Sequence, residues 1–576
     1  MDTTKPPIFS GDLREIYNRE LNEIREGGLL KQLWSGDVTL WPPLHAGSEH
    51  FRTNLEFRHL PDKLPEIAEV VLRAETLARA EGLTDRVLIA FENSHHLCEA
   101  LLNICTPPTP LNWMIMHSSH PSVIRRIESQ IELKKTLFVL VNKSGYRVGD
   151  HSLFLHFQRA IETIGSVPSS RHFVTETEPN SFLATIAKQY GFRFILDLPP
   201  VIPALYCSLV DITALLVAVA GVEPEVIRTV CRELKTTFLA PTPGEHNAVC
   251  ELAAFLSATV MRGRTFLIFL APRNLAPFAT SLCQLVGGSL GKGESGLYPV
   301  TEVGQSRAEV YAGKASVVFL RQPEENEPFM DQTASELRNR GIPFLEIKVR
   351  DPLDLLRETF LWQIGTVLAS ARTGADPFDV AEPRLPRLLT AEMLNNYSDR
   401  NDTLKRRPRI QEGGIQLFAE ARARQDISQL NLMECLVSFF EYRKRVEYFG
   451  LYVYLDKDEK VQPVFQQLRE SLSLALGVPV LLAWGPRSLD SYGYLLRVGA
   501  PGGLQMLITG DSQGDVAIPG TNYSFGQLYR ALALGQFEAL SAAPGLALRL
   551  HLASVSAASL AQLQNLIQQA LRRTTA

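Results

Sequence analysis

The sequence predicts an α/β protein with two successive units, each a parallel sheet flanked by helices, between an N-terminal helical segment and a smaller C-terminal α+β domain. First, short apolar runs of strand length alternate with longer segments of helical spacing, which is typical of parallel sheets covered on both faces. Second, this alternation stops and restarts around "APTPGEH" (240–246). Third, the chain has 576 residues, more than one hydrophobic core normally supports.

The N-terminal segment, residues 1–75, is expected to be helical. Apolar residues recur every three to four positions in 11–34 and again in 63–82. This spacing places them on one face of a helix, so each segment can pack that face against a core.

The first parallel-sheet unit is predicted for residues 76–240. The most hydrophobic stretch of the chain, 201–223, contains Pro203 and Asp211. A membrane-spanning helix needs about 20 uninterrupted apolar residues, so this stretch is expected to be a buried helix. The strand candidates are short, mostly apolar runs separated by helical segments, namely 86–91, 111–116, 136–141, 172–177 and 192–198.

The second parallel-sheet unit is predicted for residues 241–396, and a C-terminal α+β domain for 428–576. A polar, charged stretch at 397–413 indicates a linker between them, which we place at 397–427. The strand candidates of the second unit are 266–271, 315–320 and 343–349, and one long helix is expected at 352–373. The strand candidates of the C-terminal domain are 449–455, 479–484, 504–509 and 547–553. Its helix candidates are 460–476 and 556–573.

Composition disfavours several classes of function. The net charge of −4 gives no basic footprint for nucleic acid or an anionic membrane surface. The N-terminal residues lack an apolar signal segment, so a cytoplasmic protein is expected. The seven cysteines include no C-x-x-C pair, which favours free thiols in a reducing compartment and predicts no metal site.

The glycine-rich stretch "CQLVGGSLGKGESGLYPV" (283–300) raises the question of a phosphate-binding loop. A P-loop requires G-x-x-x-x-G-K-[ST]. Here Gly291 and Lys292 are followed by Gly293, and Val286 occupies the first glycine position. Nucleotide binding is therefore disfavoured, and the glycines of 287–296 are expected to shape a turn.

Six ordered segments resemble landmarks of the glucose-6-phosphate isomerase family, most closely the isomerase half of bacterial transaldolase/glucose-6-phosphate isomerase fusion proteins. The clearest is "IPGTNYSFGQL" (518–528), which resembles I-P-G-x-x-Y-[ST]-F-G-x-L. The resemblance extends over about residues 20 to 555 and includes no transaldolase half. The other segments are "LWSGDVTLW" (33–41), "VNKSGYRVGD" (141–150), "QLVGGSLGKGESGLYPV" (284–300), "ADPFDVAEP" (375–383) and "GPRSLDSYG" (485–493).

The resemblance implies two sugar isomerase (SIS) domains, each with a five-stranded parallel sheet, and interconversion of glucose 6-phosphate and fructose 6-phosphate. It implies no metal and no cofactor. The reaction requires phosphate anchors, groups that open the sugar ring, and a carboxylate base that moves a proton between neighbouring carbons. Paired SIS domains often dimerise, so a homodimer or a partnership within a sugar-phosphate enzyme assembly is expected.

The positions that match the family's catalytic residues have changed. Gly288 stands where the family has its base glutamate. Glu294 lies six residues further on in the same stretch and would substitute for it only if the loop folded back. Arg497 stands at the family's C-terminal lysine, and it keeps the positive charge but does not release a proton near neutral pH. Asp490 replaces the histidine of H-S-T-G, and Val201 replaces the arginine of G-G-R-[YF]-S.

A set of cationic and polar residues remains for phosphate. The first phosphate loop of the family reads "FENSHH" (91–96) here, and the second keeps Lys143 and Ser144. Together with His95 and Arg147 these residues are candidates for a pocket that binds a sugar phosphate or another anion through charge-assisted hydrogen bonds. The alternative is a loop whose Lys and Arg side chains face water.

Three hypotheses follow. The first is an isomerase-like protein with impaired or lost catalysis, a retained sugar-phosphate or anion site, and a regulatory or assembly role. The second is an active glucose-6-phosphate isomerase with a rearranged site that uses Glu294, His95 or Arg497. The third is a scaffold without a small ligand. Among the other conspicuous residues, Trp34 and Trp41 are expected to be packing residues, and Asp376 and Asp379 to order a turn.

Overall fold

The structure is a computed structural model, in which two compact units are recognised. Unit 1 comprises Met1–Ile115, Lys134–Tyr146 and Pro168–Ala381, and unit 2 comprises Met116–Leu133, Arg147–Val167 and Glu382–Ala576. The residues that the structure describes are 4–9, 13–42, 49–91, 93–105, 111–143, 147–165, 168–239, 246–292, 296–303, 308–311, 313–322, 328–379, 384–395, 407–419, 430–442, 446–487, 503–542 and 545–575.

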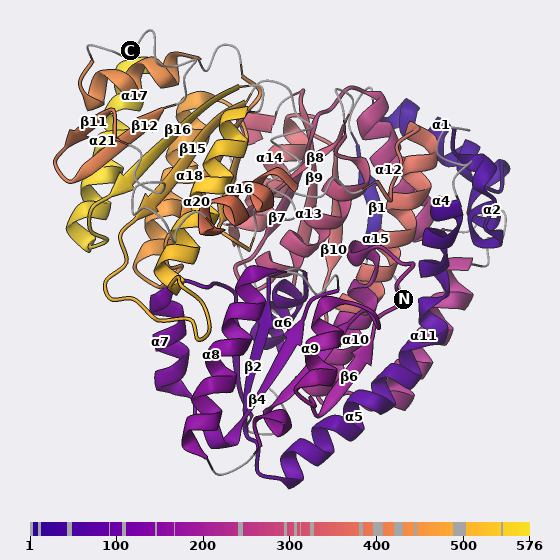
Figure 1. The fold of residues 1–576 in the computed structure, drawn as a ribbon. Helices are drawn as coiled ribbons and strands as arrows, with labels where there is room; N and C mark the ends of the chain where they lie inside the picture. Colours follow the sequence, from indigo (N-terminus) through magenta and orange to yellow (C-terminus); the bar gives the residue numbers. More distant parts are fainter. Residues whose placement is uncertain are drawn as a thin grey trace. The chain divides into compact units, whose positions relative to one another are not determined.

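The first sheet of unit 1 confirms the five strands predicted for residues 76–240 (Figure 1). Its strand order is β3-β2-β4-β5-β6, and neighbouring strands from β2 to β6 run parallel. Every residue of β2 is buried, as expected for a strand covered on both faces. The strands are β2 (Asp85–Ala90), β3 (Asn112–Met116), β4 (Thr136–Val141), β5 (Phe173–Thr177) and β6 (Phe194–Asp197).

The second sheet of unit 1 has the order β1-β10-β9-β7-β8. Strands β7, β8, β9 and β10 run parallel, but β1 pairs with β10 in the antiparallel direction. The sheet has the five strands that the resemblance implies, but one edge strand is antiparallel. The strands are β1 (Thr4–Ile8), β7 (Phe266–Ala271), β8 (Tyr298–Val303), β9 (Ala315–Arg321) and β10 (Phe344–Lys348).

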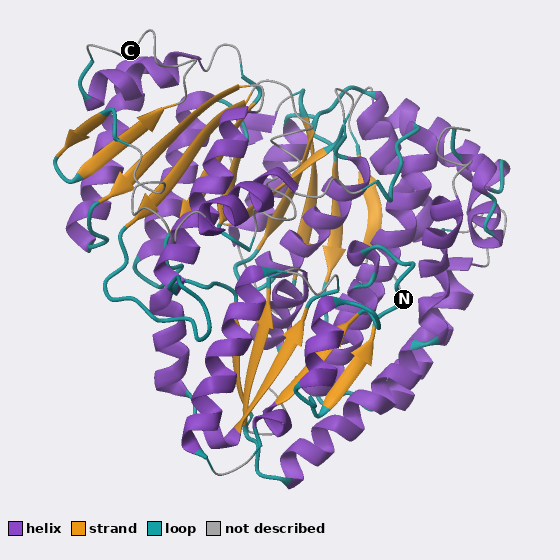
Figure 2. Cartoon of the chain, in the orientation of Figure 1, coloured by secondary structure: helices purple, strands orange, loops and turns teal. Residues whose placement is uncertain are grey.

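Helices flank both sheets (Figure 2), and the predicted α/β class is confirmed. The described α-helices of unit 1 are α1 (Leu13–Glu26), α2 (Leu29–Ser35), α4 (Glu49–Asn54), α5 (Leu64–Ala80), α6 (Asn93–Ile104), α9 (Phe182–Gln189), α10 (Ser208–Ala218), α11 (Pro224–Leu239), α12 (Ala248–Met261), α13 (Ala276–Leu290), α14 (Pro328–Asn339) and α15 (Pro352–Thr373). Short 3₁₀ helices span Val38–Leu40, Leu55–Asp62, Leu133–Lys135, Ser169–His172, Ala204–Tyr206 and Ala308–Tyr311.

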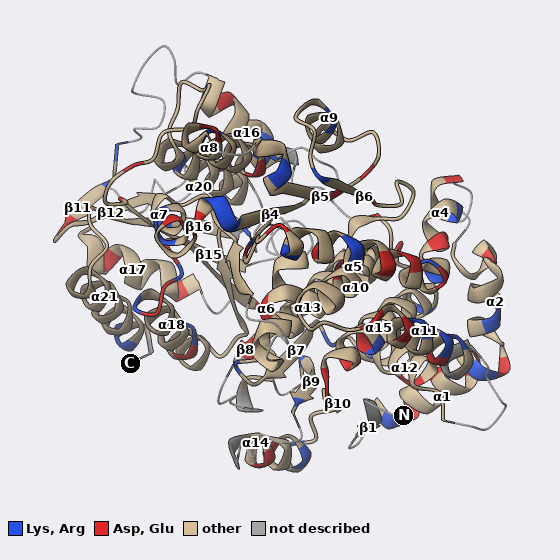
Figure 3. Ribbon diagram, turned by 90° about the horizontal axis from the view of Figure 1, so that it is seen from below, with Lys and Arg blue, Asp and Glu red and all other residues tan. Residues whose placement is uncertain are grey.

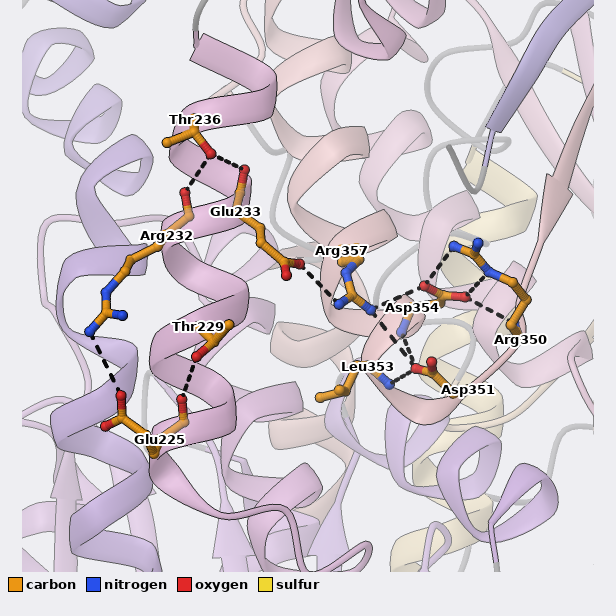
Figure 4. Close-up of polar contacts among 10 residues, drawn as sticks. All are labelled: Glu225, Thr229, Arg232, Glu233, Thr236, Arg350, Asp351, Leu353, Asp354 and Arg357. Carbon is orange, nitrogen blue, oxygen red and sulfur yellow. Dashed lines mark hydrogen bonds and ion pairs between the residues drawn. The ribbon is translucent and has the colours of Figure 1, made fainter. Parts of the chain in front are cut away.

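Helix α15 begins and ends where the sequence predicts. Asp351 caps it, since its side chain accepts hydrogen bonds from the backbone N–H groups of Leu353 and Asp354 at 2.8 and 3.2 Å. Figure 4 shows Arg357 on its first turns reaching both Asp354, at 3.2 Å, and Glu233 of α11, at 3.1 Å. These contacts fix the start of α15 beside α11.

Unit 2 contains a six-stranded mixed sheet with the order β11-β12-β16-β15-β13-β14. Strands β14, β13, β15 and β16 run parallel, whereas β11, β12 and β16 pair antiparallel. The described elements are β11 (Ile410–Glu412), β12 (Ile415–Ala419), β13 (Tyr448–Tyr454), β14 (Val480–Trp484), β15 (Gly503–Gly510), β16 (Gly545–Leu552), α7 (Pro121–Gln130), α8 (Val148–Ile164), α16 (Arg384–Asn395), α17 (Leu432–Glu441), α18 (Val461–Leu476), α20 (Phe525–Ala542) and α21 (Ala557–Thr575).

The predicted linker, 397–427, requires correction, because residues 410–419 form the hairpin of β11 and β12. Gly413 and Gly414 connect the two strands with φ values of 55° and 78°. A glycine pair is a typical two-residue hairpin connection, since both positions need positive φ. Helices α7 and α8 also group with unit 2, although the sequence assigns them to the first parallel-sheet unit.

Basic and acidic residues occur along the chain in both units (Figure 3). Within the part of the chain that the structure describes, no helix is long and apolar enough to cross a membrane.

The contact between α12 and α15 provides a test of packing in unit 1. A side chain at Gly365 would place its Cβ 2.7 Å from Cδ2 of Leu252, and leucine favours a helix more than glycine does. Gly365→Leu should nevertheless lower the free energy of unfolding by about 1–3 kcal/mol through overpacking. Urea denaturation measures this, with Ala371→Leu on the half-buried side of the same helix as the control. An unchanged stability of Gly365→Leu would contradict the described contact.

Unit 2 contains a histidine whose charge opposes folding. Nδ1 of His120 accepts a hydrogen bond from Ser122 N at 3.2 Å and so caps α7, and the ring packs edge-on against Tyr529. Burial lowers the pKa of His120 to about 4, against a smaller opposing effect of Asp456. The unfolded chain therefore takes up this proton first as the pH falls.

Stability should decrease as the pH falls from about 6.5 towards 4, by up to about 1.4 kcal/mol for each pH unit. His120→Asn keeps a capping side chain but does not titrate in this range. The variant should show a flatter pH dependence in urea denaturation between about pH 4.5 and 7. Parallel pH profiles for parent and variant would rule out His120 as the source.

Candidate functional site

The position of the family's base glutamate lies inside a helix. Gly288 is buried within α13, two residues before the helix ends at Leu290. The expectation that the glycines of 287–296 shape a turn is therefore wrong for Gly287 and Gly288. Tertiary packing overrides the low helix propensity of glycine here, since all residues from 281 to 290 are buried. At Gly291, where the helix stops, an added Cβ would lie 2.7 Å from the carbonyl oxygen of Gly287.

A hydrogen bond closes the space next to Gly288. The Tyr206 hydroxyl lies 2.8 Å from Oγ of Ser289, and 3.5 Å from the carbonyl oxygen of Pro377. Tyr206 is fully buried, and this burial raises the pKa of its hydroxyl far above its ordinary value. The hydroxyl therefore stays neutral and cannot serve as a general base near neutral pH.

Aromatic side chains complete this packing. The ring centroids of Phe57 and Phe378 lie 4.6 and 5.2 Å from that of Tyr206. Trp41 and Phe51 extend the group, and Nε1 of Trp41 donates to Ser370 at 2.9 Å. We call Trp41, Phe51, Phe57, Tyr206 and Phe378 the aromatic cluster. Its members are buried, which confirms the packing role predicted for Trp41.

The segment after α15 is held by a turn and by a lysine. Oδ1 of Asp376 accepts hydrogen bonds from the backbone N–H groups of Phe378 and Asp379 at 2.8 and 3.2 Å, which confirms the turn-ordering role predicted for Asp376. The ammonium group of Lys292 donates to the carbonyl oxygen of Asp376. Burial lowers the pKa of Lys292, against the opposing charges of Asp376 and Asp379. Lys292 therefore links the end of α13 to this turn.

The predicted phosphate residues are divided between the two units. Lys143 follows β4 in unit 1, is 6% exposed, and forms an ion pair with Glu178 as well as a 3.4 Å hydrogen bond to the Pro200 carbonyl. Its charge is thus already matched by a carboxylate. Arg147 precedes α8 and belongs to unit 2. Ser144 lies outside the described residues.

His95 lies in the first turn of α6 in unit 1 and is fully buried. Its ring centroid is 3.8 Å from that of His96, so the two rings pack against each other. Among the described residues, no group of three or more His, Cys, Asp or Glu side chains is arranged to hold a metal ion. Glu294, Asp490 and Arg497 lie outside the described residues.

The structure also brings together residues that sequence reasoning did not single out as a site. Glu176 on β5 and Asp211 in the first turn of α10 are both buried and interact through a hydrogen bond. The hydroxyl of Ser94 donates to Oδ2 of Asp211 at 2.8 Å. The signal in the sequence was Asp211 itself, a charged residue within the most hydrophobic stretch of the chain.

Comparison with known proteins agrees with this fold. A protein of Haloquadratum walsbyi described as a probable glucose-6-phosphate isomerase is 24% identical over 289 residues, which span 49% of this chain and 66% of the relative. The alignment therefore covers slightly less than two thirds of that relative. No family model matches the chain.

Many solved structures resemble the chain, and two of them superpose with TM-scores above 0.5. A glucose-6-phosphate isomerase from Chlamydia trachomatis superposes with a TM-score of 0.51 and 16% identity, over 68% of this chain and 87% of the other. A hypothetical protein of Thermus thermophilus gives a TM-score of 0.51 and 18% identity, over 66% and 94% of the two chains. These likenesses establish the fold alone. The chain is thus glucose-6-phosphate isomerase-like in fold and, at low identity, in sequence.

The hydrogen bond between Tyr206 and Ser289 can be tested with a double-mutant cycle. Tyr206→Phe and Ser289→Ala each remove one partner of a buried pair, and the coupling energy should be about 0.5–1.5 kcal/mol in favour of the native pair. Equilibrium denaturation of the parent, the two single variants and the double variant gives this value. A coupling energy of zero would mean that the two hydroxyls do not interact.

Proposed function

We propose that this protein is a glucose-6-phosphate isomerase-like protein of sugar-phosphate metabolism whose isomerase activity is lost or severely impaired. It retains an anion site for a sugar phosphate and acts in a regulatory or assembly role, as a homodimer or with a partner enzyme in the cytoplasm. The landmarks shared with the isomerase half of transaldolase fusion proteins support the family, and the halophile relative and the Chlamydia fold support the same family independently.

The main support for the proposed loss of isomerase activity is the identity and the environment of Gly288. Glycine offers no group to accept the proton, and the adjacent Ser289 is hydrogen-bonded to Tyr206 within the packed interior. A positioned general base contributes about 10²–10⁴ to the rate of proton transfer, and Gly288 supplies none. A neutral Tyr206 does not replace it.

The retained anion site is assigned to the region of Lys143. Lys143 is the one predicted phosphate ligand of unit 1, within the described residues, that has an ammonium group. Because Glu178 pairs with it, a phosphate must compete with that carboxylate. Competition with Glu178 weakens phosphate binding without abolishing it. Weak, reversible binding is consistent with a regulatory ligand that is not converted to product.

The first experiment measures conversion of fructose 6-phosphate to glucose 6-phosphate by the purified full chain. Turnover should be at least about 10²-fold below that of a family member with the base glutamate. Glu294→Ala is measured beside the parent. Clear activity in the parent that is lost in Glu294→Ala would contradict the proposal and identify a relocated base.

Thermal stabilisation by fructose 6-phosphate tests the anion site in the same preparations. Saturation at about 100 times Kd should stabilise the parent by about 2.7 kcal/mol. Lys143→Met should remove this effect, whereas Glu178→Gln should strengthen binding because it frees the lysine charge. An inactive parent without any stabilisation would contradict the ligand role and leave a scaffold.

A further inference from the structure

A cavity of about 80 Å³ lies against the first sheet in unit 1. Its floor is one face of the sheet, made by alternate residues of successive strands, and its roof is helices α5 and α10, which pack against each other (Figure 1). Strand register explains the floor. Leu88, Val139, Val174 and Phe194 are paired neighbours on β2, β4, β5 and β6.

The next row of paired residues on the floor includes an acidic side chain. Val141 pairs with Glu176, which pairs with Leu196, so a carboxyl group stands between two apolar side chains. Asp211 of α10 and Ser94 of α6 meet Glu176 at this end of the cavity. One end of an apolar cavity is therefore lined by two carboxyl groups and a hydroxyl.

The two carboxyl groups are unequal. Asp211 lies in the first turn of α10, where the helix dipole favours a negative charge, and it accepts the Ser94 hydrogen bond. Burial, and then the charge and hydrogen bond of Asp211, raise the pKa of Glu176 well above its ordinary value. The shared proton therefore resides on Glu176, and the pair carries one negative charge.

One carboxyl oxygen of Glu176 is available to accept a hydrogen bond. It is 5% exposed, and its Oε1 atom is buried without a hydrogen-bond partner among the described residues. A buried polar atom left without a partner is unfavourable, because it loses its hydrogen bonds to water and gains none in the protein. A donor from a molecule inside the cavity would remove this cost.

We propose that the cavity binds a small primary amine with a short apolar chain, whose ammonium group donates hydrogen bonds to Glu176 and Asp211. No lysine or arginine is among the described residues that line the cavity, so a cation has to come with the ligand. The volume is enough for roughly five to eight groups of the size of a water molecule, which matches an amine such as butylamine. The Val and Leu side chains of the sheet enclose the chain.

The other ionisable groups near the pair do not replace the ligand. Glu75 of α5 lines the cavity too, but its carboxylate pairs with the buried Arg86 at 2.8 Å. Burial raises the pKa of Cys207, against the opposing charge of Lys143 and with smaller contributions from the charges of Asp211 and Glu176, so that it stays a neutral thiol. Lys143 itself is paired with Glu178. When the ammonium binds, Glu176 loses its proton to solvent. Binding is therefore linked to the release of one proton.

The test is calorimetric titration of the full chain with butylammonium chloride between about pH 6 and 9, in two buffers with different heats of ionisation. An alkyl amine remains protonated up to about pH 10. Affinity should rise with pH by up to about tenfold per unit, and about one proton should be released. The absence of any binding, or binding of 1-butanol as tight as that of butylammonium, would overturn the proposal.

Variants separate the charge from the cavity. Glu176→Gln keeps the size of the side chain and a donor to Asp211, and it should weaken butylammonium binding at least tenfold and abolish proton release. Ala214→Leu, which adds side-chain volume to the cavity lining and leaves both carboxyl groups in the chain, should also abolish binding. Glu225→Gln on α11, which removes an exposed carboxylate paired with Arg228 at 2.9 Å, is the control and should bind like the parent. Equal loss in the control would overturn the assignment of the site.

Discussion

The buried hydrogen bond between Tyr206 and Ser289 is the interaction on which the organisation of unit 1 depends. It connects the segment that follows the first sheet to the last turn of α13, and Tyr206 also reaches the turn that follows α15. The aromatic cluster and the Lys292 hydrogen bond close the same region. Because the three segments are joined through buried groups, the protein is closely packed around Ser289, the residue that follows Gly288.

Much of the fold was predictable because its strands are buried on both faces. Strands such as β4 and β7 are continuous apolar runs between polar ends, and their predicted limits are correct to within about a residue. The exceptions have physical reasons. Strand β1 contains Pro6 and Pro7, which remove N–H donors and exclude it from a central position, so only an edge pairing in three dimensions reveals it. The glycine pair of the β11–β12 hairpin was a usable signal within a charged stretch.

The candidate site was less predictable from sequence. The substitution at Gly288 could be located by aligned neighbours, but its helical, buried setting depends on tertiary packing. The partner of Lys143 could not be foreseen, because Glu178 is separated from it by a whole helix and strand along the chain. Glu176 and Asp211 show the same limit. Neither belongs to a motif, and only the fold, which places β5 and α10 along the same cavity, brings the two carboxyl groups together.

The two carboxyl groups of the proposed amine site differ in one physical respect from the base that an isomerase would need. A catalytic carboxylate must meet the substrate carbon, whereas Glu176 and Asp211 face a cavity lined by apolar side chains beneath two helices. The amine site that we propose would therefore hold a cation and would not transfer a proton between sugar carbons.

The central claim is that the chain does not abstract a proton from a sugar phosphate. The most direct measurement is NMR detection of deuterium uptake at C1 of fructose 6-phosphate and at C2 of glucose 6-phosphate during incubation with the full chain in D₂O. This reports proton transfer itself, even when net conversion is small. The account predicts incorporation no faster than in buffer alone. Incorporation that scales with protein concentration would contradict it, because a working base would then exist.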